Sequence, residues 1–373
     1  MRKLRKVLVS LVMFLVIPKI VWAGQIVEEA ADIVYIPYEF NVYAGNYFGA
    51  YHLATFCAQE VLVVDRANNG WIKISSHMGY VWTRIAPPPS DILEGRIIIL
   101  DAGHGIENSP AFADYVESVA MLDLALRIKP LLERHGATVL LTRSDQHDIH
   151  LTVRAAQINI WSLDFLHNAR VQELYITQNE AHAENLRYQI AEIKRLIGVM
   201  ENVVYDWQAY APTYFNFPFD RTHQRVIDPD LRRIFELQAD PIIRDNFLMF
   251  SLHSNATGRP INTEINGVDI YRMTNDFSNT ANYFAEYSNV ERTYHLSNVL
   301  MDNITQTGLA KRNIRPSNFF IIREHNLSGI LVENGFHTNE HDRSLLSNGY
   351  FLQHLASAYE DAILQYFLYI LQR

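Results

Sequence analysis

The sequence holds a single cysteine, Cys57, among its 373 residues. One thiol cannot form an internal disulfide, so the stability of the fold must come from its apolar core. Cys57 is also the only candidate for a thiol nucleophile, but it lies in an apolar stretch with no clear catalytic partner. We therefore expect a buried structural cysteine and no thiol chemistry.

Positive charge is scarce as well. The chain has 32 Lys and Arg residues against 41 Asp and Glu residues, which gives a formal net charge of −9 at pH 7. Binding to phosphate backbones depends on clustered Lys and Arg side chains, and an acidic chain is poorly suited to it. The charge balance therefore argues against a nucleic-acid-binding protein.

The first residues lack an apolar run of the ~20 residues that a membrane-spanning helix needs. An apolar stretch at 7–17 follows four basic residues and is interrupted by Pro18 and Lys19. This pattern predicts a secretory signal peptide over 1–23, cleaved after Ala23; the alternative is an uncleaved membrane anchor. Cleavage removes five positive charges and lowers the net charge from −9 to −14. We expect an exported protein of the periplasm or cell envelope, without a stable membrane span.

What the sequence does contain is enough apolar residues, 49%, for a sizeable core and more than one domain. Three consecutive prolines at 87–89 cannot continue a helix or a strand ladder, so we predict a stiff linker over 87–94. The linker separates a first domain, 30–86, from a larger domain, 95–372.

The first domain carries short strand-like runs at 61–64 and 71–74 on either side of the turn signal Asn68-Asn69-Gly70, with a last run ending at Trp82. This predicts a small all-β barrel. The stretch resembles a bacterial SH3-like module, on Gly70-Trp71 and Gly79-Tyr80-Val81-Trp82. The resemblance implies binding of cell-wall peptides, and the alternative is a domain that serves only for packing or spacing.

The larger domain alternates buried strands with amphipathic helices, which predicts an α/β fold with a mostly parallel twisted sheet and flanking helices. Strands are expected at 96–100, 138–142, 247–252, 267–272, 319–323 and 330–332, and helices at 119–133, from 149, at 288–308 and at 349–371.

A segment from 161 to 245 interrupts this alternation. Apolar residues from Leu186 to Val204 recur at spacings of four and three, as on a long helix, and Asp228-Pro229 is typical of a capped helix start. We interpret 161–245 as a helical insertion, which packs on its own domain, covers a cleft or binds a partner.

Three polar side chains stand at the ends of apolar strands: His104, His253 and Glu333. In open α/β sheets, the ligand site lies beyond the carboxyl ends of the strands. Two imidazoles and one carboxylate are sufficient to bind a catalytic zinc ion that keeps one position open, and a further carboxylate is needed to transfer protons. Glu107 and Glu117 are the candidates for the remaining carboxylate.

The larger domain resembles the zinc-dependent N-acetylmuramoyl-L-alanine amidases over 95–160 and 247–370. The matching pieces are Leu100-Asp101-Ala102-Gly103-His104-Gly105, Glu117 before a Leu-rich helix, 136–143, Leu151 to Arg154, Ser251-Leu252-His253-Ser254-Asn255-Ala256, and Leu331-Val332-Glu333-Asn334-Gly335-Phe336 followed by Asn339. Two departures are Ala102, where relatives have Pro, and Ile106, where they have Gly.

The resemblance implies one zinc ion per chain, bound by His104, Glu117 and His253, and Glu333 as the catalytic carboxylate. Arg143, Arg154 and Asn255 are candidates for substrate binding, with a structural role as the alternative for the arginines. His337 and His341 have the spacing of a helical metal pair but lack its glutamate; we interpret them as solvated or supporting residues.

The sequence thus predicts a peptidoglycan hydrolase that cleaves the amide bond between N-acetylmuramic acid and L-alanine. The alternatives are a catalytically inactive cell-wall-binding protein and a zinc peptidase that acts on muropeptides. Some relatives carry an inhibitory helix that a partner protein displaces. An activator or divisome-type protein acting on 161–245 is therefore a candidate partner, beside peptidoglycan itself.

Overall fold

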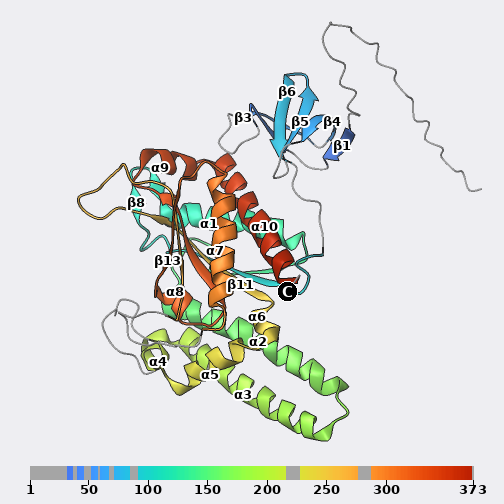
Figure 1. Cartoon of the computed structure of the whole chain (residues 1–373). Helices are drawn as coiled ribbons and strands as arrows, with labels where there is room; N and C mark the ends of the chain where they lie inside the picture. The colour runs from blue at the N-terminus through green and yellow to red at the C-terminus, as the bar shows by residue number, and fades with distance from the viewer. Residues whose placement is uncertain are drawn as a thin grey trace, which may run out of the picture.

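The computed structural model describes residues 32–36, 40–45, 52–57, 59–66, 71–84, 91–215, 227–275 and 287–371. The predicted signal peptide, the turn at Asn68-Asn69-Gly70 and the three prolines lie outside these residues. The chain forms a small β domain followed by a larger α/β domain, from which a pair of long helices projects (Figure 1).

The β domain contains one antiparallel sheet of six strands in the order β1-β4-β5-β6-β2-β3. Its strands are β1 (Asp32–Ile36), β2 (Phe40–Tyr43), β3 (His52–Phe56), β4 (Gln59–Arg66), β5 (Trp71–Ser76) and β6 (Gly79–Arg84). The predicted runs at 61–64 and 71–74 are confirmed as β4 and β5, whose valines and isoleucines form the core of this domain. The likeness to an SH3 module stays a prediction.

Cys57 corrects one expectation. It is exposed, because it follows the last residue of β3 at the edge of the small sheet and not within its core.

The larger domain is built on a six-stranded sheet in the order β10-β7-β11-β14-β12-β13. Its strands are β7 (Ile97–Ala102), β10 (Thr138–Leu141), β11 (Phe247–Asn255), β12 (Val268–Arg272), β13 (Lys311–Pro316) and β14 (Ser328–Phe336). The first four strands in this order are parallel, and β12 runs antiparallel to β14, so that Asp269 lies opposite Glu333. The predicted α/β fold with a mostly parallel sheet is confirmed.

Both faces of this sheet are covered, which explains why its central strands are apolar without interruption. In β7, Ile98 and Leu100 belong to the core on one face, whereas Ile97 and Ile99 belong to the core on the other. β11 alternates in the same way between the two cores. The polar residues of the site, His253 and Glu333, lie in the carboxyl-terminal halves of β11 and β14.

Three helices pack on one face of the sheet: α1 (Glu117–Glu133), α7 (Val290–Thr305) and α10 (Gly349–Leu371) (Figure 1). The short helix α9 (Glu340–Leu346) follows β14. The β domain contacts α10 through His354, whose Nε2 bonds the hydroxyl of Tyr43 and whose ring lies 4.7 Å from the Tyr43 ring. None of the helices within the described ranges has the length and apolar character needed to cross a membrane.

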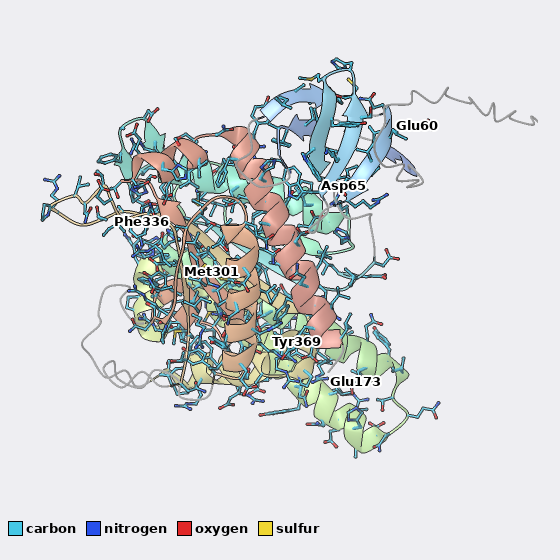
Figure 2. The ribbon with its side chains drawn as sticks, turned by 45° about the horizontal axis from the view of Figure 1, so that its top comes forward. Glu60, Asp65, Glu173, Met301, Phe336 and Tyr369 are labelled. Atoms are coloured by element: carbon cyan, nitrogen blue, oxygen red, sulfur yellow. The ribbon has the colours of Figure 1, made fainter. Side chains whose placement is uncertain are left out.

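The other face carries the helices of the interrupting segment: α2 (Leu151–Ile176), α3 (Glu180–Tyr205), α4 (Trp207–Tyr214), α5 (Pro229–Gln238) and α6 (Pro241–Arg244). Helices α2 and α3 form the projecting hairpin, with Glu173 near its free end (Figure 2). The helix start at Asp228 is confirmed, because its carboxylate accepts from two amides of α5. The predicted insertion boundary at 161 falls inside α2, because that helix runs on without a break.

The prediction of a strand at 319–323 is wrong. The strand is β13, which ends at Pro316, and the following apolar residues form the one-turn helix α8 (Phe320–Arg323). Periodicity cannot separate a buried strand from a buried helical turn in so short an apolar run. Here Phe320, Ile321 and Ile322 pack into the core beneath the sheet.

Candidate metal centre

His104 is positioned by the turn that follows β7. Its φ angle is +58°, a left-handed conformation that costs a non-glycine residue energy and recurs at functional sites. The preceding Gly103 is required by close packing, since a Cβ atom there would lie 2.3 Å from the Cε1 of His253. The turn therefore brings the two histidines together, with ring centroids 5.0 Å apart.

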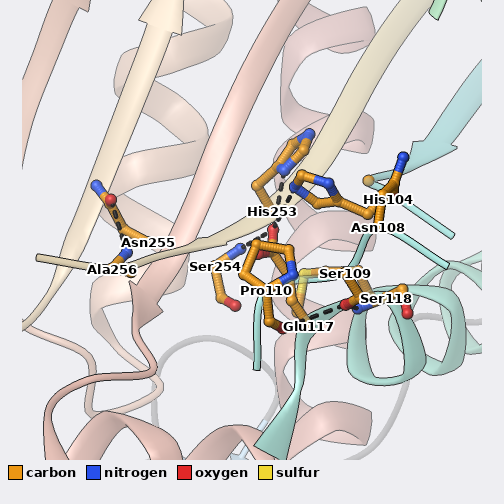
Figure 3. Close-up of polar contacts among 12 residues, drawn as sticks. His104, Asn108, Ser109, Pro110, Glu117, Ser118, His253, Ser254, Asn255 and Ala256 are labelled. Atoms are coloured by element: carbon orange, nitrogen blue, oxygen red, sulfur yellow. Dashed lines mark hydrogen bonds and ion pairs between the residues drawn. The ribbon is translucent and has the colours of Figure 1, made fainter. Parts of the chain in front are cut away.

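Glu117 is the first residue of α1 and is almost completely buried, at 1% exposure. Its Oε1 accepts hydrogen bonds from the Nδ1 of His253 at 2.9 Å and from the amide of Ser254 at 3.1 Å (Figure 3). The same oxygen lies 3.6 Å from the Nε2 of His104. The short hairpin of β8 (Ala111–Phe112) and β9 (Tyr115–Val116) leads the chain from the His104 turn to this position.

His104, Glu117 and His253 each offer one ligand atom, and these atoms all lie within 4.8 Å of one another. In a tetrahedral zinc site with metal–ligand bonds of about 2.0–2.1 Å, ligand atoms are about 3.4 Å apart. The donor set of two imidazoles and one carboxylate also suits zinc. The three residues therefore fit a metal ion with only small adjustments of their side chains.

The electrostatics of the three residues are coupled. Burial by itself raises the pKa of Glu117, but the hydrogen bond from His253 and the nearby imidazoles outweigh it and lower the pKa. Burial by itself lowers the pKa of His253, but Glu117 and Glu333 outweigh it and raise the pKa. Burial lowers the pKa of His104. Glu117 thus favours the protonated form of His253, so a metal ion competes with a proton for this imidazole.

Glu333 lies beside His253, because the two residues are paired in register on the neighbouring parallel strands β14 and β11. Its Oε2 is buried and has no hydrogen-bond partner among the residues that the structure describes. Burial, reinforced by Glu117 and Asp269, raises the pKa of Glu333 to about 8, although the charge of His253 acts in the opposite direction. A carboxyl group whose pKa is raised and whose oxygen is not engaged in a hydrogen bond is suited to proton transfer beside a metal site.

Arg143 and Arg154 are buried and hold the His104 turn. Arg154 donates to the carbonyls of Ala102 and His104 and forms an ion pair with Asp101 at 3.0 Å. Arg143 donates to the carbonyls of Ala102 and Gly103. These main-chain contacts correct the substrate-binding prediction for Arg154, because the remaining N–H groups of its guanidinium bond Ile149 and Asp148. They give both arginines the structural role that the sequence left as the alternative.

The other predicted residues lie around this centre. The side chain of Asn255, at the end of β11, accepts from the amide of Ala256, and its substrate role stays a prediction. Glu107 is turned away from the three ligands and bonds His147 and the amide of Asp148. His341 is exposed.

His337 has a supporting role that the sequence only hinted at. It is 2% exposed, its Nδ1 lies 3.0 Å from the Oγ of Ser254, and its ring stacks on Tyr115 with centroids 5.4 Å apart. The Tyr115 hydroxyl donates to the same Oγ at 2.9 Å. Because the Ser254 amide binds Glu117, this buried contact fixes β9, β11 and the end of β14 around the ligands.

A cavity of about 500 Å³ opens next to the three ligands. His104, His253 and Glu333 line one side of it, and Leu151 and Phe319 belong to its apolar wall. His150 stands at the start of α2 in the same lining, and Trp207 of α4 stacks flat on it with centroids 3.7 Å apart. The interrupting segment therefore reaches the rim of the cavity.

We expect the substitution Gly103→Ala to weaken metal binding by about 10-fold or more, comparable to the loss of a supporting residue in other metal sites. The new methyl group must displace the His253 ring, which it would otherwise meet at 2.3 Å. Competition with a chromogenic chelator measures the affinity. The matched control is Gly198→Ala on α3, where no atom of the described ranges lies within 4 Å of an added Cβ. Equal affinities for the two variants would show that the close approach does not position His253.

A family model described as N-acetylmuramoyl-L-alanine amidase matches residues 98–168 and 236–365, more than half of the chain. The match covers all four residues of the centre and omits 169–235, which carries most of α3 to α5. No curated protein sequence matches the chain.

Solved structures with similar folds include amidases from several bacteria. The catalytic domain of CwlV from Bacillus (Paenibacillus) polymyxa var. colistinus is 18% identical, with 73% of this chain and 97% of that chain covered and a TM-score of 0.41. AmiC2 of Nostoc punctiforme is 18% identical, with 75% and 98% covered and a TM-score of 0.42. CwlD from Clostridioides difficile, solved in complex with the GerS lipoprotein, is 17% identical, with 74% and 99% covered and a TM-score of 0.42.

Proposed function

Because this chain belongs to the N-acetylmuramoyl-L-alanine amidase family, we propose that it is a zinc-dependent enzyme that cleaves the amide bond between N-acetylmuramic acid and L-alanine in peptidoglycan. The observation that carries the proposal is the convergence of His104, Glu117 and His253 within 4.8 Å, with Glu333 paired in register beside His253.

The three ligands hold one zinc ion in this proposal. When bound, zinc acts as a Lewis acid that polarises the amide carbonyl and lowers the pKa of water to about 7. The preference for zinc rests on the two imidazoles and one carboxylate that serve as donors. We expect the affinity for zinc to rise with pH, because the metal competes with a proton for His253.

Glu333 moves the protons. Its buried Oε2 is free to accept a proton from the attacking water and to return it to the departing amino group of L-alanine. A nearby divalent cation lowers the pKa of a carboxylate, so the metal-bound protein holds Glu333 ionised at lower pH than its value of about 8 without the metal.

Product analysis tests the proposal. Purified peptidoglycan is incubated with the zinc-loaded protein, and the soluble products are identified by mass spectrometry. We expect peptides that begin with a free L-alanine amino group. Cleavage inside the peptides would instead identify the zinc peptidase, and wall binding without any product would identify the inactive binding protein.

The substrate of this family lies in the cell envelope, so we propose that the chain is exported, with 1–23 as its signal peptide. The domain limits at 30–86, 87–94 and 95–372 remain part of this proposal, as does wall binding by the β domain. The helical insertion at 161–245 also remains part of this proposal, and the gap in the family match between 168 and 236 lies within it.

We further propose that α4 restricts access to the cavity and is the point at which a protein activator would act. The stacking of Trp207 on His150 at the cavity rim supports this. Trp207→Ala is expected to raise kcat/KM on intact peptidoglycan severalfold and to leave small soluble muropeptides unchanged. Tyr205→Ala is the control, because Tyr205 is 89% exposed. An unchanged or lower rate on intact peptidoglycan would rule out restriction by this contact.

A further inference from the structure

A second, polar cleft of about 580 Å³ lies at the same edge of the sheet as the metal ligands. Its lining comes from Phe112 of β8, from Thr263 and Glu264 after β11, and from the residues of α9. Figure 1 shows β8 and α9 near one another at this end of the domain. Each lining segment directly adjoins an element that carries a site residue, because β11 bears His253, β14 before α9 bears Glu333, and the β8–β9 hairpin leads to Glu117.

Three contacts connect this cleft to the metal ligands. The Ser254 amide donates to Glu117 at 3.1 Å, and the Ser254 hydroxyl lies 3.0 Å from the Nδ1 of His337. The carbonyl of His337 accepts from the Nη1 of Arg343 at 3.1 Å. Arg343 is thus fixed relative to Glu117 through buried groups, although it belongs to a different element.

The guanidinium of Arg343 is held in place but not neutralised. It lies 5.1 Å from the centre of the Phe112 ring, and His337 holds one of its nitrogens. No carboxylate among the described residues forms an ion pair with it, although Glu264 and Glu340 line the same cleft. The cleft therefore presents one positive and two negative groups that remain available to a ligand.

A zwitterionic peptide is the ligand that matches this arrangement. In peptidoglycan, L-alanine is followed by a D-glutamate that is linked through its side chain and keeps a free α-carboxylate. A diamino acid with a free ammonium group comes next. A peptide extends by about 3.5 Å per residue, so these two residues lie within about 11 Å of the scissile amide. Arg is well suited to a carboxylate because its N–H groups form a planar fork.

We propose that this cleft binds the second and third residues of the stem peptide. Arg343 binds the α-carboxylate of D-glutamate, and Glu264 and Glu340 face the ammonium group of the diamino acid. The proposal rests on the proposed function, because it takes peptidoglycan as the substrate. The proposal also favours this cleft over the cavity beside His104, His253 and Glu333. That cavity is walled by Leu151 and Phe319, and all three guanidinium nitrogens of its arginine, Arg154, already donate to protein oxygens.

The test compares two disaccharide tripeptides that differ only at D-glutamate, one with a free α-carboxylate and one with this group amidated. For Arg343→Ala, we expect KM for the free acid to rise about 10-fold with kcat nearly unchanged, as for the loss of a charged hydrogen bond. KM for the amidated substrate should change little. The control is Arg315→Ala, which removes an exposed arginine at the end of β13.

An equal rise of KM for both substrates, or a fall in kcat alone, would show that Arg343 only supports His337 and would overturn the proposal. Calorimetry on the Glu333→Gln variant measures binding of the tripeptide L-Ala-γ-D-Glu-meso-diaminopimelate without hydrolysis. We expect the added Arg343→Ala substitution to weaken this binding about 10-fold. If the wild-type protein cleaves no muropeptide but the tripeptide still binds through Arg343, the proposed function fails and the cleft assignment survives.

Discussion

Replacing Glu333 with glutamine is expected to lower kcat for peptidoglycan hydrolysis by about 10³-fold, within the range for a group that transfers protons in the transition state. Glutamine keeps the size of the side chain but cannot accept the proton of the attacking water. The three metal ligands are untouched, so elemental analysis should still find zinc bound. Retained turnover in this variant would exclude Glu333 as the base.

The same substitution is expected to stabilise the metal-free protein. Burial raises the pKa of Glu333 to about 8, whereas an unfolded glutamate titrates at about 4.5. The folded protein therefore binds more protons than the unfolded chain between these values, and it loses stability as pH rises through this window. At pH 7, removing the ionisable group should raise the free energy of unfolding by about 2 kcal/mol or more.

Urea unfolding of the metal-free wild-type and Glu333→Gln proteins at pH 5 and pH 7.5 measures this difference. The gain should be larger at pH 7.5. The control is Glu60→Gln, which removes an exposed carboxylate of β4 in the β domain and should show no such gain. Loss of activity together with a gain in stability would separate a catalytic role from simple misfolding.

Removing the metal is the second change with a large expected effect. A strong chelator should abolish hydrolysis, and zinc should restore it. His253→Ala should prevent this restoration, because it removes one of three ligand atoms that lie within 4.8 Å of one another. Equilibrium dialysis followed by elemental analysis measures zinc content independently of activity. Activity that persists in metal-free protein would contradict the assignment of these residues.

Zinc binding should also release protons. Burial lowers the pKa of His253, but Glu117 and Glu333 more than compensate and raise it. The proton that His253 holds must leave when the metal binds, so the affinity for zinc should rise with pH through neutrality. Calorimetry in buffers of different ionisation enthalpy counts the protons. The Glu333→Gln variant should release fewer of them than the wild type, since the cation no longer displaces a proton from that carboxyl group.

The sequence predicted most strands of the larger sheet because both faces of the sheet are buried. A strand covered on both sides is mostly apolar, so polar residues such as His253 and Glu333 stand out in the sequence. Both lie within their strands, because β11 runs on to Asn255 and β14 to Phe336. The choice of Glu117 over Glu107 did not come from periodicity. It needed the family resemblance, and the structure shows why: Glu117 opens a helix that packs under the ends of β7 and β11.

The roles that the sequence left open, and the one strand that it misplaced, depend on contacts between distant segments. Arg143 and Arg154 resemble substrate-binding residues until their carbonyl partners in the His104 turn are seen. His337 is polar and lies in a polar stretch, but stacking on Tyr115 buries it. The apolar residues at 320–323 fit a strand equally well, and only the adjacent end of β13 assigns them to a helical turn.

The antiparallel direction of β12 determines which part of the chain can vary in sequence close to the metal ligands. A parallel neighbour would have required the chain to cross the domain after β11, as it does from β7 to β10 and from β10 to β11. Because β12 begins at the edge where β11 ends, residues 256–267 remain on the side of the metal ligands. Their length and sequence can therefore vary without altering either core. We therefore expect changes in this connection to alter substrate preference without changing the fold.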